Sequence, residues 1–157
     1  MTTPATSELV KGLAPDEAEA ILALGKRATL APGTVLFQLG DDAHSLYLIE
    51  RGRVALTLPM QVHGREEDLL VEERLGGQTV GWSALIPPHR FTLKAATQIE
   101  TEVMVLARQA LNEHLATRPS VAHALTMNLA SVIGQRLQVF QAMWLREMQR
   151  VVELRSA

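Results

Sequence analysis

The feature that most constrains the fold is a long stretch without proline, from Val121 to about Leu154. Ser120, which follows Arg118-Pro119, stands where a helix N-cap is expected. The apolar positions beyond it recur at steps of three and four residues, which predicts one helix with a continuous apolar face. At 1.5 Å per residue this helix is about 50 Å long. Its apolar positions are Leu125, Leu129, Ile133, Leu137, Phe140, Trp144, Met148 and Val151.

This apolar face is too long to be covered by the chain alone. The 157 residues correspond to a single domain (1–157), and the core of such a domain does not extend over 50 Å. We therefore expect the helix to pair with the same helix of a second copy, as in a two-stranded coiled coil. Gly134 and Arg136 interrupt the heptads, and the alternative is a helix that folds back across its own domain. The predicted dimer seam comprises Leu129, Ile133, Leu137, Phe140 and Trp144.

The residues before this helix predict a mainly β fold with flanking helices. A helix is expected within about residues 10–27, where Pro15-Asp16-Glu17 suits the helix start. Short β-like runs separated by Gly, Pro and Asp fill residues 28–106, and helices follow over 107–155. Even spacing of short strands is typical of a closed or sandwiched antiparallel sheet. Residues 61–68 are expected to form a polar loop, and Glu72-Glu73 to be solvated hairpin charges.

Composition excludes several classes of protein. The chain has no cysteine, so it has no disulfide and no thiolate metal site. No apolar run of about 18 residues predicts a membrane span, and the first eight residues lack the pattern of a secretion signal. These features favour a cytoplasmic location. Residues 107–157 hold six basic and three acidic residues, a smaller excess than DNA binding usually requires.

Several motifs resemble the cyclic nucleotide-binding domain. They are the glycine-and-strand pattern of residues 30–54, the run Gly81-Trp-Ser-Ala-Leu85, Glu102-Val103, and the helical segment Arg136-Leu-Gln-Val139. The resemblance implies a double-stranded β-helix (jelly-roll) whose interior holds a small ligand, closed by the long helix at a dimer axis. In catabolite activator-type transcription factors a helix-turn-helix domain follows that helix. Since this sequence stops at Ala157, we expect no direct DNA binding.

The resemblance also places a phosphate cassette, whose first half is altered here. Family members that bind cyclic nucleotides carry Gly-Glu-x-Ala-Leu, in which the glutamate accepts from the ribose hydroxyl. This sequence reads Gly81-Trp82-Ser83-Ala84-Leu85. An indole donates and cannot accept a hydrogen bond, so Trp82 does not replace that glutamate.

The second half of the cassette, Arg-[Ser/Thr]-Ala in the family, is altered as well. Alignment without gaps from Glu102 puts Phe91 in the place of the arginine and Thr92 in that of the serine or threonine. Arg90 then lies one residue early, on the opposite face of a strand, while a shifted register offers Lys94. The helix alignment brings Phe140 and Gln141 near the base. The predicted pocket residues are Gly81, Trp82, Ser83, Ala84, Arg90, Phe91, Thr92, Phe140 and Gln141.

These changes disfavour binding of cyclic AMP in the usual way, because losing a buried charged partner costs about 2–5 kcal/mol. The pocket is then either filled by Trp82 and Phe91 or occupied by a less charged ligand. The sequence carries no catalytic motif and no histidines at metal-ligand spacing, so we expect no enzyme, metal or cofactor. We predict a regulatory, ligand-sensing or interaction module that forms a homodimer. The alternative is a genuine cyclic nucleotide receptor subunit that signals to a separate effector.

Overall fold

The computed structural model describes residues 7–157. Residues 1–6, which hold most of the stretch considered above for a secretion signal, lie outside this range. The elements are, in chain order, α1 (Pro15–Leu22), β1 (Lys26–Leu30), β2 (Val35–Phe37), β3 (Ser45–Arg51), β4 (Arg53–Val62), β5 (Arg65–Leu75), β6 (Thr79–Val80), the 3₁₀-helix η2 (Trp82–Ala84), β7 (Lys94–Thr97), β8 (Thr101–Ala107), α2 (Arg108–Leu115) and α3 (Pro119–Arg155).

Within residues 7–157, eight antiparallel strands form two four-stranded sheets, ordered β1-β8-β3-β6 and β2-β7-β4-β5. Apolar residues of both sheets, such as Leu46, Leu48, Val54 and Leu56, are buried in one core. Because side chains of a strand alternate between its faces, each sheet supplies one inward row to that core. The predicted jelly-roll with a long C-terminal helix is confirmed.

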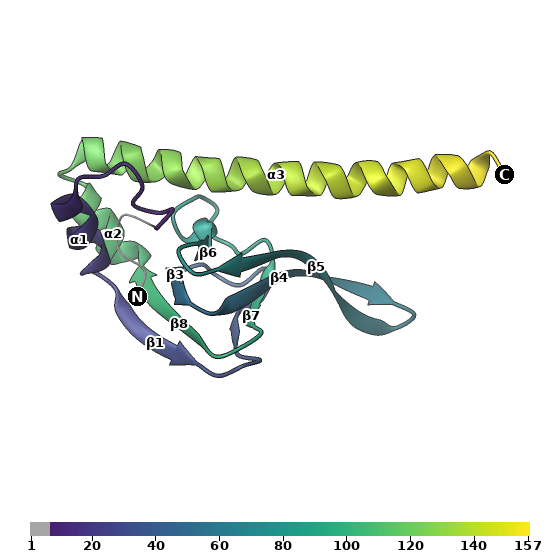
Figure 1. The fold of residues 1–157 in the computed structure, drawn as a ribbon, viewed down its shortest axis with the longest axis horizontal. Helices are drawn as coiled ribbons and strands as arrows, with labels where there is room; N and C mark the ends of the chain where they lie inside the picture. Colours follow the sequence, from purple (N-terminus) through teal and green to yellow (C-terminus); the bar gives the residue numbers. More distant parts are fainter. Residues whose placement is uncertain (1–6) are drawn as a thin grey trace.

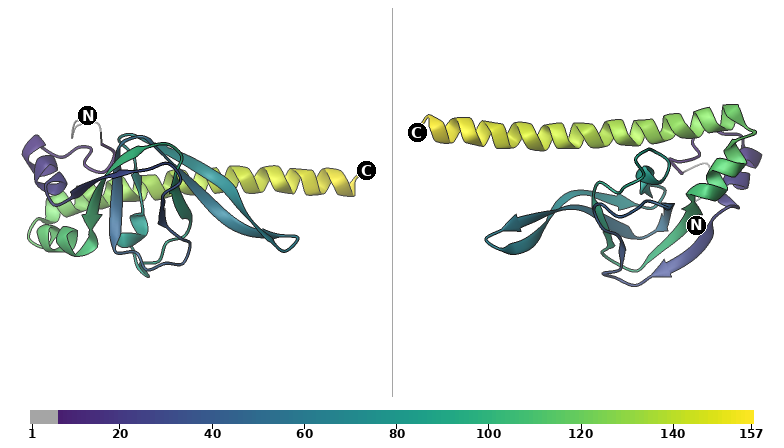
Figure 2. Two further views of the ribbon diagram at one scale, coloured as in Figure 1. Left: turned by 90° about the horizontal axis from the view of Figure 1, so that it is seen from below. Right: turned by 180° about the vertical axis from the view of Figure 1, so that it is seen from behind.

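The helix α3 lies along one side of the roll and continues beyond it (Figure 1). Val121, Leu125, Leu129 and Val132 in its first half are buried against the core. The two-stranded extension formed by β4 and β5 runs in the same direction as the second half of α3 (Figure 2). The roll therefore covers only the first half of the apolar helix face.

Some predicted boundaries were wrong. The N-terminal helix occupies only Pro15–Leu22, and the first strand begins at Lys26. The segment 61–68, expected to be a loop, is mostly strand, with only His63-Gly64 in the turn. Its polar side chains are exposed while its backbone pairs along the hairpin, from Met60↔Glu67 to Val62↔Arg65. Ladder hydrogen bonds use the backbone alone, so side-chain polarity did not reveal this strand.

No helix within residues 7–157 is long and apolar enough to cross a membrane.

Candidate functional site

The interior of the roll, where the resemblance places a ligand, contains a cavity of only about 10 Å³. A cavity of this size holds about one water molecule. It has no room for a nucleotide in this conformation. The lining residues are Phe37, Leu56, Gly81, Trp82, Ser83, Phe91, Thr92, Leu93 and Arg136.

Two stacked phenylalanines line this cavity. The rings of Phe37 and Phe91 are nearly parallel, with centroids 3.6 Å apart and an angle of 8° between their planes. Both residues are buried. The ring of Tyr47 lies 6.0 Å from that of Phe37, and burial raises the pKa of the Tyr47 phenol. The pair thus presents buried apolar surface to the cavity.

Gly81 allows the chain to turn closely around these rings. Its φ is +89°, in the left-handed region that favours glycine. A Cβ at this position would come within 3.2 Å of both the Phe91 ring and the Ser45 carbonyl oxygen. This glycine therefore sets the start of η2 directly against the stacked pair.

Most of the predicted pocket residues of the roll line this cavity, and two, Ala84 and Arg90, do not. Gly81, Trp82, Ser83, Phe91 and Thr92 line it, and Ala84 is buried in the adjoining core. Phe91 takes the place that the resemblance gives to the arginine.

The structure places Arg90 outside the pocket. Its side chain is 61% exposed and lies 3.3 Å from an Asp42 carboxylate oxygen, and its Nη1 donates to the Gly40 carbonyl oxygen. The backbone of Arg90 forms an isolated antiparallel β-bridge with Asp42, and the next residue, Phe91, is buried. The side chains of Arg90 and Phe91 therefore point to opposite faces. Lys94, the other candidate cation, pairs with Asp68 at 2.7 Å. Neither Arg90 nor Lys94 therefore lines the cavity.

The helix presents a different residue to the cavity from those expected. Phe140 is half-buried against the core cluster and Gln141 is exposed, and neither lines the cavity. Arg136, one turn earlier, does, and it is only 7% exposed. In the sequence Arg136 interrupts the predicted apolar face, and its burial was not expected. The available signal for its burial was that Arg136 lies on the apolar face of the long helix, part of which the roll must cover. Charged residues at such positions are buried mainly when they are paired.

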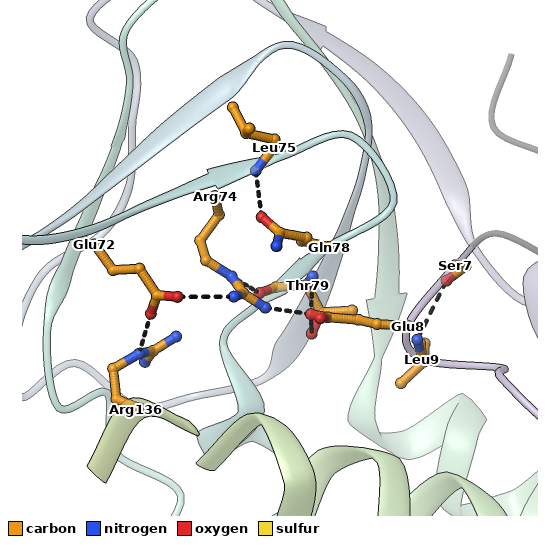
Figure 3. A network of polar contacts seen from close by, with 9 residues as sticks. All are labelled: Ser7, Glu8, Leu9, Glu72, Arg74, Leu75, Gln78, Thr79 and Arg136. Carbon is orange, nitrogen blue, oxygen red and sulfur yellow. Dashed lines mark hydrogen bonds and ion pairs between the residues drawn. The ribbon is translucent and has the colours of Figure 1, made fainter. Parts of the chain in front are cut away.

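Arg136 belongs to a buried cluster of charged groups (Figure 3). Its Nε donates to Glu72 Oε2 at 2.7 Å. The other oxygen of this carboxylate accepts from Arg74 Nη1 at 3.0 Å. Arg74, 2% exposed, also donates to the Thr79 carbonyl oxygen and to Glu8. Glu72 is therefore shared by two arginines, and its interpretation as a solvated charge was wrong.

This cluster joins three parts of the chain that are distant in sequence. Glu8 comes from the N-terminal segment, Glu72 and Arg74 from β5, and Arg136 from α3. Removing one member of a buried ion pair typically costs 3–5 kcal/mol, because the remaining charge loses its compensation. The position of α3 on the roll thus depends on a charge held by β5.

The predicted seam residues lie in different environments along α3. Leu129 is 1% exposed within its own chain, so it has no surface for a partner. Ile133 and Phe140 are half-buried, whereas Leu137 and Trp144 are 58% and 66% exposed. The exposed apolar face therefore begins near Ile133.

No cluster of three or more histidines or carboxylates that could hold a metal ion occurs within residues 7–157. The described part of the chain thus offers a cavity, a charge cluster and an exposed apolar helix face. A β-roll with an interior site closed by a helix defines a ligand-sensing type of domain.

Comparison with known sequences gives the family. The model of the cyclic nucleotide-binding domain matches residues 27–118, and the chain belongs to this family of regulatory and sensing modules. It is 31% identical over 133 residues to the "Cyclic AMP receptor protein" of Thermus thermophilus. This match covers 84% of the chain and 58% of the relative. The chain thus spans less than two-thirds of the length of that relative.

Solved structures agree with this assignment. The catabolite activator protein of Thermus thermophilus is 29% identical, with a TM-score of 0.69 over 96% of this chain and 63% of that one. The N-terminal domain of a transcriptional regulator from Streptomyces coelicolor is 26% identical, with a TM-score of 0.70 over 88% of this chain and 94% of that one.

Proposed function

We propose that the protein is a non-enzymatic, homodimeric regulatory module that does not bind cyclic AMP in the way usual for its family. The observation that carries this proposal is the stacked pair of Phe37 and Phe91, which line a cavity of only about 10 Å³. A cyclic nucleotide would have to displace these rings and bury its phosphate without an arginine from the roll. An uncompensated buried charge of this kind costs several kcal/mol, enough to remove two or more decades of affinity.

The exposed apolar half of α3 supports the homodimer. Leu137, Trp144 and Val152 are each more than half exposed, and contiguous apolar surface of this kind marks interaction sites. A groove of about 640 Å³ between the β4–β5 hairpin and α3, lined by Leu69, Leu70 and Met143 among others, adjoins this face. A second copy of α3 is the partner that matches its length.

Signalling in this proposal passes through the angle between the roll and α3. A ligand or partner protein shifts that angle only if it contacts the two arrangements differently. The small basic excess of residues 107–157 favours a protein effector over DNA, and the composition favours the cytoplasm as its location.

Isothermal titration with cyclic AMP tests the proposal. We expect no binding at micromolar nucleotide, with the Thermus thermophilus receptor protein as positive control. Micromolar affinity would contradict the proposal and favour a genuine cyclic nucleotide receptor subunit that acts on a separate effector. Light scattering after gel filtration tests the dimer, for which we expect twice the chain mass of 17.2 kDa.

A further inference from the structure

The strand β5 has one edge without a partner. It is the last strand in the order β2-β7-β4-β5, and it pairs only with β4. Within residues 7–157, the backbone groups of residues 65–74 make no hydrogen bond outside this ladder. Residues 65–70 are all exposed. An open strand edge of this kind presents N–H and C=O groups that can pair with a further strand.

The groove of about 640 Å³ between the hairpin and α3 passes along this open edge. Its strand side is formed by Met60 of β4 and by Leu69, Leu70 and Val71 of β5. Successive side chains of a strand point to opposite faces, so a groove lined by both Leu69 and Leu70 is not confined to one face of the sheet. It passes around the outer edge of β5, where the unpaired backbone groups lie.

The helix side of the groove is apolar and carries one unpaired charge. Val139 and Met143 of α3 are half-buried there, and Arg146 follows about one turn further along the helix. The guanidinium group of Arg146 makes no hydrogen bond or ion pair within the part of the chain that the structure describes. Glu147, which also lines the groove, is already in an ion pair with Arg150. An occupant with an acidic group on its helix side is therefore favoured.

The backbone groups of β5 decide among the possible occupants of this groove. A helix uses its N–H and C=O groups internally, and an acyl chain has no such groups, so neither can pair with a strand edge. A second copy of α3 would cover the apolar side chains and leave the edge of β5 open. An extended polypeptide pairs with the edge through its backbone and places alternate side chains in the groove. It is therefore the occupant that matches both walls.

We propose that the outer edge of β5 and the facing side of α3 form a docking site for an extended segment of a partner protein. The segment adds a strand to the sheet, antiparallel to β5, since antiparallel pairing is the more stable of the two arrangements. Its helix side is apolar next to Val139 and Met143 and carries an acidic residue next to Arg146. This inference rests on the proposed function and deepens it, because it names how the interaction module recognises its partner.

The dimensions of the groove set the length of the segment. Its helix side runs from Val139 to Glu147, about 12 Å at 1.5 Å per residue. An extended chain, which rises about 3.3 Å per residue, covers this length with about five residues. A register shift leaves Val71 out of the ladder with β4, so the regular edge ends before it. Glu66 and Glu67 are exposed nearer the hairpin turn and do not line the groove.

Titration of the ¹⁵N-labelled full chain with the blocked peptide acetyl-Val-Thr-Val-Thr-Asp-Thr-amide tests the proposal. We expect saturable shifts of the amide signals of residues 65–71, strongest at alternate positions, because every second residue of an edge strand bonds to a given neighbour. Two forms of the peptide, N-methylated at its odd or at its even residues, serve as matched controls. One form should weaken binding by at least about tenfold, since it loses its hydrogen bonds to β5, and the other should still bind.

A charge exchange tests the role of Arg146. Lysine in place of the aspartate of the peptide should weaken binding to the unmodified chain by about two- to fivefold, the effect of an exposed ion pair. Arg146→Glu should reverse this preference. Arg155→Glu, an exposed change in the last turn of the same helix, should leave it unchanged. An identical preference in Arg146→Glu and the unmodified chain would overturn the proposal.

Two other results would also overturn it. Absence of saturable shifts removes the docking site, and equal binding of both N-methylated peptides shows that the groove takes apolar chains by burial alone. Slow hydrogen exchange of every β5 amide in the free dimer shows that a second copy already covers the edge.

Failure of this inference is distinguishable from failure of the proposed function. Loss of the peptide site together with no cyclic AMP binding leaves the interpretation of the roll unchanged. Micromolar cyclic AMP binding overturns the proposed function, whatever the response to the peptide.

Discussion

Replacing Phe91 by alanine tests the claim that its ring fills the interior of the roll. Phe91 is 6% exposed and stacks on Phe37. Removing a buried phenylalanine side chain costs about 3–5 kcal/mol of the free energy of unfolding. The additional stabilisation of aromatic pairs belongs to offset or edge-to-face arrangements, whereas these two rings are nearly face to face, with centroids 3.6 Å apart. We therefore expect a loss of about 3–5 kcal/mol, from burial alone.

The loss is measured by urea unfolding at fixed protein concentration, since dimerisation makes the apparent stability depend on concentration. For a chain of this length a loss of about 3–5 kcal/mol corresponds to a fall in Tm of roughly 6–20 °C. Thr92→Ala is the matched control, because Thr92 is the exposed neighbour in sequence. Such a surface change should stay within about 0.5 kcal/mol.

The vacated space provides an independent readout. Dry apolar cavities made by removing a large side chain bind small apolar molecules such as benzene. Benzene should therefore raise the Tm of Phe91→Ala and leave that of the unmodified protein unchanged. A loss of less than about 1 kcal/mol, with no effect of benzene, would refute the reasoning that these rings occupy the ligand space.

Three further predictions concern the helix, the charge cluster and the phenol. Leu137→Asp or Trp144→Asp should reduce the mass in light scattering to that of one chain while the helical circular dichroism signal is kept, and a persistent dimer would contradict the seam. Arg74→Met should lower the free energy of unfolding by about 3–5 kcal/mol, since Glu8 and Glu72 lose their shared partner, and an unchanged urea midpoint would argue against the cluster. Burial raises the pKa of the Tyr47 phenol above its ordinary value of 10.0, so the stability that the neutral phenol contributes is present below pH 10 and is lost as the pH rises through the raised pKa. The free energy of unfolding of Tyr47→Phe should therefore fall less at alkaline pH than that of the unmodified protein. An equal fall would be evidence against this burial effect.

The fold was predictable from the sequence because its signals are local. Glycines such as Gly33, Gly40 and Gly52 have positive φ at the turns between short strands, and the three-four apolar spacing produced α3. Alignment of a short motif also placed Phe91 at the pocket, and filling of the pocket by aromatic side chains was one of the two alternatives that this alignment left open. These features depend on residues within a few positions of one another.

The charge cluster was not predictable because its partners are far apart in the chain. Arg136 and Glu72 are separated by 64 positions, and Arg74 and Glu8 by 66. The position of Arg136 on the apolar face is a signal for its burial, but it does not identify the acidic residue that pairs with it. The sequence also could not show which of Arg90, Lys94 and Arg136 lies at the cavity. That depends on which face of each strand points inward and which turn of α3 packs over the roll, and both are set by the tertiary structure.

The attachment of the N-terminal segment to α3 has a consequence for how movement of that helix can be observed. The side-chain amide of Asn128 donates to the carbonyl oxygens of Leu9 and Lys11, each at 2.9 Å, and the backbone N–H of Glu8 donates to the Gly77 carbonyl oxygen. Swinging α3 away from the roll must break the first two of these bonds or carry the segment 9–11 with it, which leaves the third as its remaining hydrogen bond to the roll among the three. Amide hydrogen exchange at residues 8–11 should therefore accelerate when α3 is released from the roll. The exchange rate of this segment then reports on the position of α3.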